Sequence, residues 1–108
     1  MKLILTVCKG NIHRSVIAKL CIQKKLTELG LDDKFKVDSC GLLGTCGTEM
    51  PRFPNMMGYA DLWALTDSHL QRLGIEVPET QTAKPIDRAI AQEASLILAM
   101  NREILCEL

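Results

Sequence analysis

Aromatic side chains are scarce in this sequence of 108 residues, in which Phe, Trp and Tyr together make up 4%. A core must therefore be built from Leu, Ile, Val, Ala and Met. Net charge is also absent, because 13 Lys and Arg residues balance 13 Asp and Glu residues. No basic block or stripe departs from this balance, which argues against nucleic acid or an acidic membrane surface as a partner.

Long apolar runs are missing as well. None approaches the roughly 20 residues that a membrane-spanning helix needs, and residues 1–7 form too short a stretch for a signal peptide. The five cysteines are odd in number and include no C-x-x-C pair, so neither a disulfide framework nor a zinc site is expected. These absences together predict a cytoplasmic protein.

The rest of the composition is ordinary for a globular domain, with 47% hydrophobic and 24% charged residues. The chain has no internal repeat, low-complexity tract or linker, so residues 1–108 are interpreted as a single domain. A chain of this length buries about two-thirds of its unfolded surface without help from metals or disulfides.

Apolar periodicity places strands and helices in alternation along the chain. Strands are expected over Leu3–Val7, Phe35–Asp38 and Leu96–Met100. Helices are expected over Arg14–Leu29, Ala60–Leu73 and Pro85–Ala94, with another beginning at Arg102. Alternation of this kind predicts a parallel sheet in a doubly wound α/β fold. The segment Gly41–Gly58 is poor in regular patterns and is expected to be a long surface loop.

The segment between the first strand and the first helix carries a chemical pattern, V-C-K-G-N-I-H-R-S at residues 7–15. Cys8 ends the strand, Gly10 and Asn11 lie in the turn, and Arg14 opens the helix. Backbone N–H groups of such a turn can point inward and, with the helix N-terminus, bind an anion. Arg14 can bind two phosphoryl oxygens at once, and the same positive field stabilises a thiolate at Cys8. The segment predicts a phosphate-binding loop with a nucleophile at its base.

A simpler interpretation is that Cys8 is a core residue and Arg14 a solvated residue at the start of a helix. The strand, the Gly-Asn turn, Ser15 and the helix occur together, and this combination weighs against the simpler interpretation. Nucleotide-binding loops occupy the same place in other proteins, but neither G-x-G-x-x-G nor G-x-x-x-x-G-K-[ST] occurs here.

Residues 7–15 resemble the signature of the low molecular weight protein tyrosine phosphatases. The resemblance continues in order along the chain, apart from the segment after Gly41. It is carried by Val37–Gly41 (the family's V-x-S-A-G), Leu73–Ile75, Ala83–Ile86 (its A-R-Q-I) and Leu96–Met100. The fold that it implies is a flavodoxin-like, doubly wound parallel sheet.

The resemblance also implies a role for each residue of the loop. Cys8 would be the nucleophile that takes the phosphoryl group, Arg14 would bind the transition state, and Ser15 would donate a hydrogen bond to the thiolate. Asn11 would support the loop from a left-handed backbone conformation, with Ser39 in the same network. The substrate-binding positions would be Lys9, Gly10, Asn11, Ile12 and His13. The implied substrates are phosphotyrosine proteins or small aryl phosphates, with no metal or cofactor.

Several residues depart from the family pattern. Lys9 replaces an apolar or small residue and would favour anionic substrates. His13 stands where many members have a second cysteine, and it is interpreted as a solvated loop histidine. Phe53, Tyr59 and Trp63 are candidates for substrate recognition, although Trp63, at helical spacing, is more typical of a core.

The family's general acid has no counterpart in this sequence. Family members supply an aspartate from a D-P-Y-like segment beyond a fourth strand, and no such segment occurs before Leu108. Loss of a positioned acid costs a factor of about 10²–10⁴, so we expect low activity toward phosphotyrosine. Without the family's last strand and helix, Leu96–Met100 would be an exposed apolar edge. We therefore expect either a homodimer or a chain that is shorter than the natural protein.

Three functions remain in competition. A tyrosine-phosphatase-type hydrolase with a cysteinyl-phosphate intermediate fits the loop best. An arsenate reductase shares the fold and the loop, but it needs two further cysteines after the third strand, where Met100 and a single Cys106 lie. The non-enzymatic alternative is a phosphoprotein-binding or regulatory module that keeps the loop without turnover.

Overall fold

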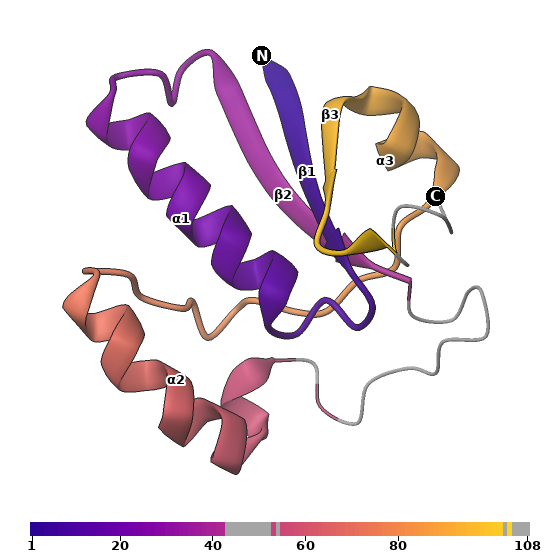
Figure 1. Ribbon diagram of the computed structural model, residues 1–108. Helices are drawn as coiled ribbons and strands as arrows, with labels where there is room; N and C mark the ends of the chain where they lie inside the picture. Colours follow the sequence, from indigo (N-terminus) through magenta and orange to yellow (C-terminus); the bar gives the residue numbers. More distant parts are fainter. Residues whose placement is uncertain (43–52, 54, 103, 105–108) are drawn as a thin grey trace.

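Three parallel strands form the centre of the molecule. The computed structural model describes residues 1–42, 53, 55–102 and 104 (Figure 1). The strands are β1 (Lys2–Cys8), β2 (Phe35–Gly41) and β3 (Ala94–Ala99), and the sheet order is β2-β1-β3. β1 is central and almost wholly buried, as its nearly unbroken apolar run predicts. The α/β fold class is confirmed.

Helices alternate with the strands along the chain. They are α1 (Arg14–Glu28), α2 (Ala60–Arg72) and α3 (Arg88–Glu93), and a single turn of 3-10 helix, η1 (Met56–Gly58), precedes α2. α1 and α2 match the expected helices within one residue at each end. Gly30 and Gly74 follow these two helices with φ of 70° and 69°, the left-handed conformation in which glycine ends a helix at little cost.

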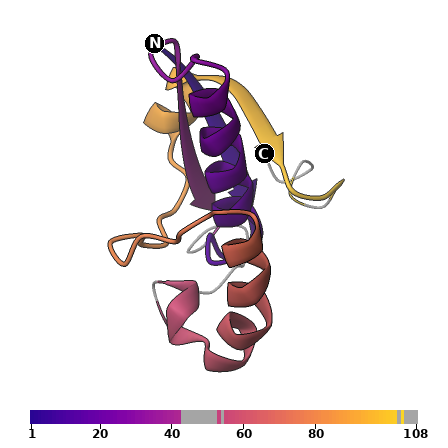
Figure 2. The ribbon, with the colours of Figure 1, turned by 90° about the vertical axis from the view of Figure 1, so that its left-hand side faces the viewer.

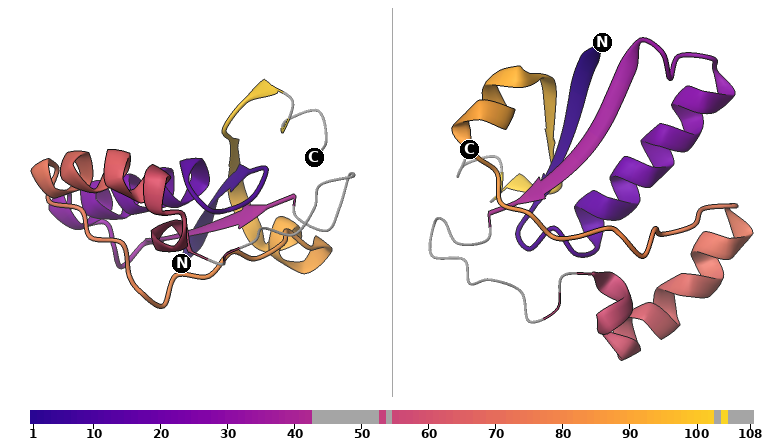
Figure 3. Two further views of the ribbon diagram at one scale, coloured as in Figure 1. Left: turned by 90° about the horizontal axis from the view of Figure 1, so that it is seen from below. Right: turned by 180° about the vertical axis from the view of Figure 1, so that it is seen from behind.

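The two faces of the sheet are covered by different elements, as a doubly wound fold requires. On β1, the hydroxyl of Thr6 contacts α1, whereas Leu5 and Val7 pack with Ile90 of α3. Neighbouring residues of a strand point to opposite faces, so α1 and α3 lie on opposite sides of the sheet (Figure 3). α2 packs against α1 through a second apolar cluster that includes Val16 and Leu70, and the two helices lie in one layer (Figure 2).

The helix predicted over Pro85–Ala94 begins three residues later, at Arg88. Pro85 instead forms a parallel bridge with Gly41, and the N–H of Ile86 donates to the Gly41 carbonyl at 2.9 Å. This pairing keeps the backbone extended beyond the proline. The carboxylate of Asp87 then caps α3 by accepting from the N–H of Ile90 at 2.8 Å. β3 follows at once and begins at Ala94 rather than at the expected Leu96.

Two expected elements fall largely outside the described residues. These are most of the loop expected over Gly41–Gly58, and the helix expected from Arg102 onward. No helix within the described ranges combines the length and the apolar character that crossing a membrane requires. At the described carboxyl end of the strands, Cys8 is in register with Gly41, and Val7 with Ala99. The loop that follows Cys8 therefore begins at this edge of the sheet.

Candidate active site

Cys8 is the last residue of β1 and is 2% exposed. Residues 9–13 form the turn that follows it, and Arg14 begins α1. The N–H of Leu42 donates to the carbonyl oxygens of both Cys8 and Lys9, at 3.2 and 2.9 Å. The end of β2 therefore holds the first residues of the loop in place.

The sulfur of Cys8 has two polar neighbours that can act as donors. The backbone N–H of Asn11 lies 3.2 Å from Sγ, and the hydroxyl of Ser15 lies 3.0 Å from it. The Asn11 side-chain amide donates to Ser15 Oγ at 2.9 Å, which leaves the Ser15 hydroxyl proton free to point at the sulfur. Both groups are placed to donate a hydrogen bond to the sulfur.

Asn11 is completely buried and supports the loop through both its backbone and its side chain. Its φ of 52° lies in the left-handed region, where an ordinary L-residue is strained by roughly 1–2 kcal/mol. Its Oδ1 accepts from the N–H of Lys84 at 3.0 Å, while its Nδ2 donates to Ser15. Both ends of the amide are used, so its orientation is determined by its partners.

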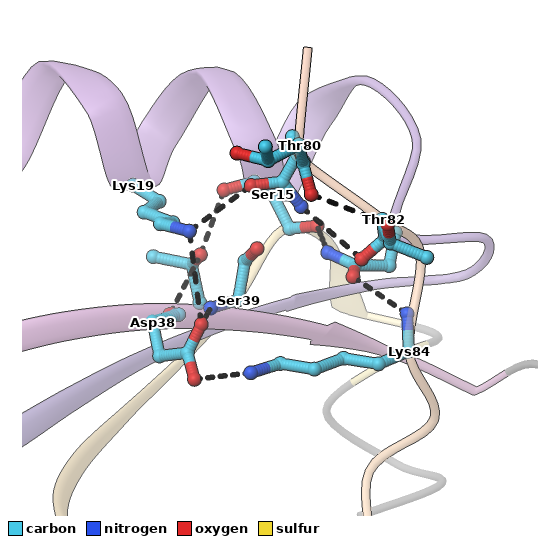
Figure 4. Close-up of polar contacts among 10 residues, drawn as sticks. Ser15, Lys19, Asp38, Ser39, Thr80, Thr82 and Lys84 are labelled. Carbon is cyan, nitrogen blue, oxygen red and sulfur yellow. Dashed lines mark hydrogen bonds and ion pairs between the residues drawn. The ribbon is translucent and has the colours of Figure 1, made fainter. Parts of the chain in front are cut away.

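Behind the loop, Asp38 of β2 forms ion pairs with Lys84 and Lys19 (Figure 4). Burial is the largest single effect on the pKa of Asp38 and raises it, but the hydrogen bonds from Lys84 and from the Ser39 N–H act in the opposite direction. Together with the charges of Lys84 and Lys19, they hold the pKa of this carboxyl below its ordinary value. Because the N–H of Lys84 also holds Asn11, this ion pair positions a residue that supports Cys8.

The hydroxyl of Thr6 is a further support that the sequence pattern did not indicate. Thr6 lies in the middle of β1, and its hydroxyl donates to the Ser15 carbonyl at a distance of 2.7 Å. This hydrogen bond joins the first turn of α1 to the sheet. Thr6 makes a contact that was not expected, whereas in the described part of the chain the Ser39 side chain lacks one that was. Its hydroxyl is buried, yet among the described residues it has no hydrogen-bond partner. Within the described residues, the Ser39 hydroxyl therefore does not join the network around Asn11 that was expected of it.

A pocket of about 300 Å³ opens above the sulfur. Its lining residues are Cys8, Gly10, Ile12, His13, Arg14, Tyr59 and Leu62. Most of the predicted loop positions are thus brought together around one space, with the exposed Arg14 among them. Lys9 is exposed and does not line this pocket, and Asn11 is buried beneath the loop.

His13 is half-buried, which corrects its interpretation as a solvated loop residue. Its Nε2 lies 2.9 Å from the hydroxyl of Thr66 in α2. Burial and the neighbouring charge of Arg14 lower the pKa of His13 from its ordinary value. The sequence pattern did not single out Thr66, since it lies 53 residues away along the chain.

The three candidate aromatic residues have different surroundings. Tyr59 lines the pocket, and the ring of Phe53 packs edge-on against it with centroids 5.1 Å apart. Trp63 packs against the cluster between α1 and α2 and lines a different pocket. Its placement agrees with the expectation that helical spacing is typical of a core residue.

Cys40 on β2 is a second buried cysteine. Burial is the main cause that raises the pKa of the Cys40 thiol to about 11, so this thiol stays protonated and unreactive at neutral pH. Cys21 is also a free thiol, whereas Cys46 and Cys106 lie outside the described residues. Within the described part of the chain, no group of three His, Cys, Asp or Glu side chains could hold a metal ion.

Comparison with known proteins shows the family of this chain. The family profile described as "Low molecular weight phosphotyrosine protein phosphatase" matches residues 3–108. The chain belongs to the low molecular weight phosphotyrosine protein phosphatase family. A curated phosphatase of this name from Pongo abelii is 32% identical over 107 residues, which is 99% of this chain and 60% of that protein.

Solved structures of low molecular weight phosphatases and their relatives share the fold. YfkJ from Bacillus subtilis has a TM-score of 0.75 and 28% identity, with 100% of this chain and 60% of that chain covered. The low molecular weight protein tyrosine phosphatase of Streptococcus pyogenes has the same TM-score at 20% identity, with 99% and 61% covered. The chain thus has the flavodoxin-like fold of the family and spans about 60% of the length of these relatives.

Proposed function

We propose that this chain acts as a tyrosine-phosphatase-type hydrolase in which Cys8 is the nucleophile. The observation that carries the proposal is the contact of Cys8 Sγ with Ser15 Oγ and the Asn11 N–H, at the base of a pocket lined by Arg14. The sulfur can accept hydrogen bonds from both groups, and the adjacent helix N-terminus and guanidinium suit an oxyanion.

The proposed reaction has two steps. The Cys8 thiolate attacks the phosphorus atom, so that an S–P bond forms while the bond from phosphorus to the leaving oxygen breaks. The Arg14 guanidinium binds two oxygens of the transferring group, and the Ser15 hydroxyl stabilises the sulfur as it leaves in the second step. Water then cleaves the S–P bond, which releases inorganic phosphate and restores the thiolate.

The leaving oxygen needs a proton, and this sequence contains no D-P-Y-like segment that would supply it. We therefore propose that the 108-residue chain hydrolyses phosphotyrosine about 10²–10⁴ times more slowly than a site with a positioned acid does. An activated aryl phosphate such as p-nitrophenyl phosphate is less affected, because p-nitrophenolate leaves without protonation.

The proposed substrates are phosphotyrosine proteins or small aryl phosphates, with Tyr59 as one wall for the aromatic group. A site that depends on a free Cys8 thiol suits a reducing compartment, and we propose a cytoplasmic location.

The decisive experiment replaces Cys8 by Ser and measures p-nitrophenyl phosphate hydrolysis together with vanadate binding. We expect hydrolysis to be abolished while the oxyanion still binds. Cys21→Ser, at a half-buried thiol within α1, is the control that should keep its activity. Hydrolysis that survives in Cys8→Ser would refute the assignment. Binding of a phosphotyrosine peptide without turnover in the unmodified chain would instead favour the regulatory module.

A further inference from the structure

The hydrogen bond between His13 and Thr66 bears on which nitrogen of the His13 ring carries a proton. The Thr66 hydroxyl has one proton, and it donates this proton to the carbonyl of Leu62 at 2.8 Å within α2. The same oxygen lies 2.9 Å from His13 Nε2, and while the hydroxyl proton is donated to Leu62 this oxygen accepts from that nitrogen. In this arrangement Nε2 carries the hydrogen, and Nδ1 is the nitrogen left to gain or lose a proton.

We propose that Thr66 is a positioning residue that holds His13 in its Nε2–H form beside the pocket, where protonation at Nδ1 adds a second cation next to Arg14 and strengthens oxyanion binding. This inference rests on the proposed function, since it concerns the same pocket. It assigns a use to the residue that stands where many family members have a cysteine.

The contact survives protonation of the ring. An imidazolium ion donates from both nitrogens, so the Nε2–H bond to Thr66 is the same in the neutral and the charged forms. Thr66 is only 8% exposed and is held within α2 by its bond to Leu62. His13 can therefore acquire its charge without moving relative to the loop or to α2.

The His13 ring gains its positive charge in the acidic pH range. Burial and Arg14 place the pKa of His13 below its ordinary value of 6.5, so the ring is neutral at pH 7 and becomes charged as the pH falls. A bound oxyanion brings negative charge to this pocket and favours the protonated ring. The other ionisable groups that line the pocket are Cys8 from β1, Arg14 from α1 and Tyr59 ahead of α2.

Sulfate is the suitable probe because its charge stays constant between pH 5 and 8, unlike that of phosphate. We expect calorimetric titration to show sulfate affinity rising about three- to tenfold from pH 7.5 to pH 5.5. The His13→Gln variant should bind sulfate with a much smaller pH dependence, and this comparison removes the contribution of Cys8. A pH dependence equal in both proteins would overturn the inference.

The position of the proton is tested separately by the ¹⁵N chemical shifts of the His13 ring. We expect the Nε2–H form in the unmodified chain and in Thr66→Ser, and a mixture of both neutral forms in Thr66→Val. An Nδ1–H form in the unmodified chain would contradict the role of Thr66. Absence of sulfate binding at every pH would contradict the proposed function itself, whereas binding without pH dependence would contradict only the present inference.

Discussion

Among single residues, Asn11 carries an unusual combination of demands. It holds a left-handed backbone conformation at φ 52° while its side chain links Lys84 to Ser15. Glycine would satisfy the first demand but not the second, and alanine would satisfy neither. The choice of asparagine is thus explained by the backbone and the amide together.

A pair of substitutions at this position separates the two contributions. Both variants lose the side-chain bonds, but Asn11→Ala keeps a Cβ in the left-handed region, whereas Asn11→Gly removes it. We expect the free energy of unfolding of Asn11→Ala to lie about 1 kcal/mol below that of Asn11→Gly, as measured by urea denaturation. Equal losses in the two variants would show that backbone strain is negligible at this site.

At the scale of elements, Asp38 connects three segments that are far apart in sequence. From β2 it pairs with Lys19 of α1 and with Lys84, which lies ahead of α3. Lys84 in turn bridges to the phosphate-binding loop through its N–H bond to Asn11, and its carbonyl accepts from the N–H of Gly41. The loop is therefore supported by an ion pair that does not touch the pocket.

Replacing Asp38 by Asn should make stability less dependent on pH. The pKa of Asp38 in the fold is below its ordinary value of 3.8, so its stabilising effect is present above that value and is lost as the pH falls through the lowered one. We expect the unmodified chain to be about 1 kcal/mol more stable than Asp38→Asn at pH 7. The difference is small because Lys84 is 44% exposed and solvent screens the ion pair. The difference should narrow below pH 4.

Thermal unfolding of both proteins between pH 3 and 7 measures this effect. Glu28→Gln is the matched control, because it removes an ion pair with Lys25 that is exposed on α1. A stability difference for Asp38→Asn that stays constant down to pH 3 would contradict the prediction.

At the scale of the whole molecule, the chain has no net charge, but exposed apolar side chains are unevenly distributed over its surface. β3 is an edge strand of the described sheet, and Leu96 on it is 50% exposed. Edge strands with apolar side chains pair readily with other chains. We propose that this edge mediates a homodimer, which is one of the two alternatives expected from the sequence.

Sedimentation velocity at micromolar concentration tests this proposal. We expect a mass above that of the monomer, and dissociation in Leu96→Lys, because a charged side chain on an edge opposes strand pairing. Leu65→Lys is the control, since Leu65 is 72% exposed on α2, away from the sheet. A stable monomer of the unmodified chain would refute the assembly.

Local sequence patterns were sufficient to predict those elements whose conformation depends on residues nearby in the chain. The apolar run of β1 and the helical spacing of α1 and α2 appear as predicted, and the strand-turn-helix around Cys8 forms as expected. The start of α3 was wrong because Pro85 pairs with Gly41, 44 residues earlier. A pattern read within a window of ten residues cannot contain such a partner.

The sequence by itself determined the order of elements, the loop of residues 7–15 and the family to which it belongs. Only the tertiary structure decided which residues support that loop: Thr6 beneath Ser15, Lys84 against Asn11, and Thr66 against His13. Each of these contacts is a hydrogen bond between segments that are joined by packing rather than by chain connectivity. Its partners become neighbours only when burial of the apolar faces brings the sheet and helices together.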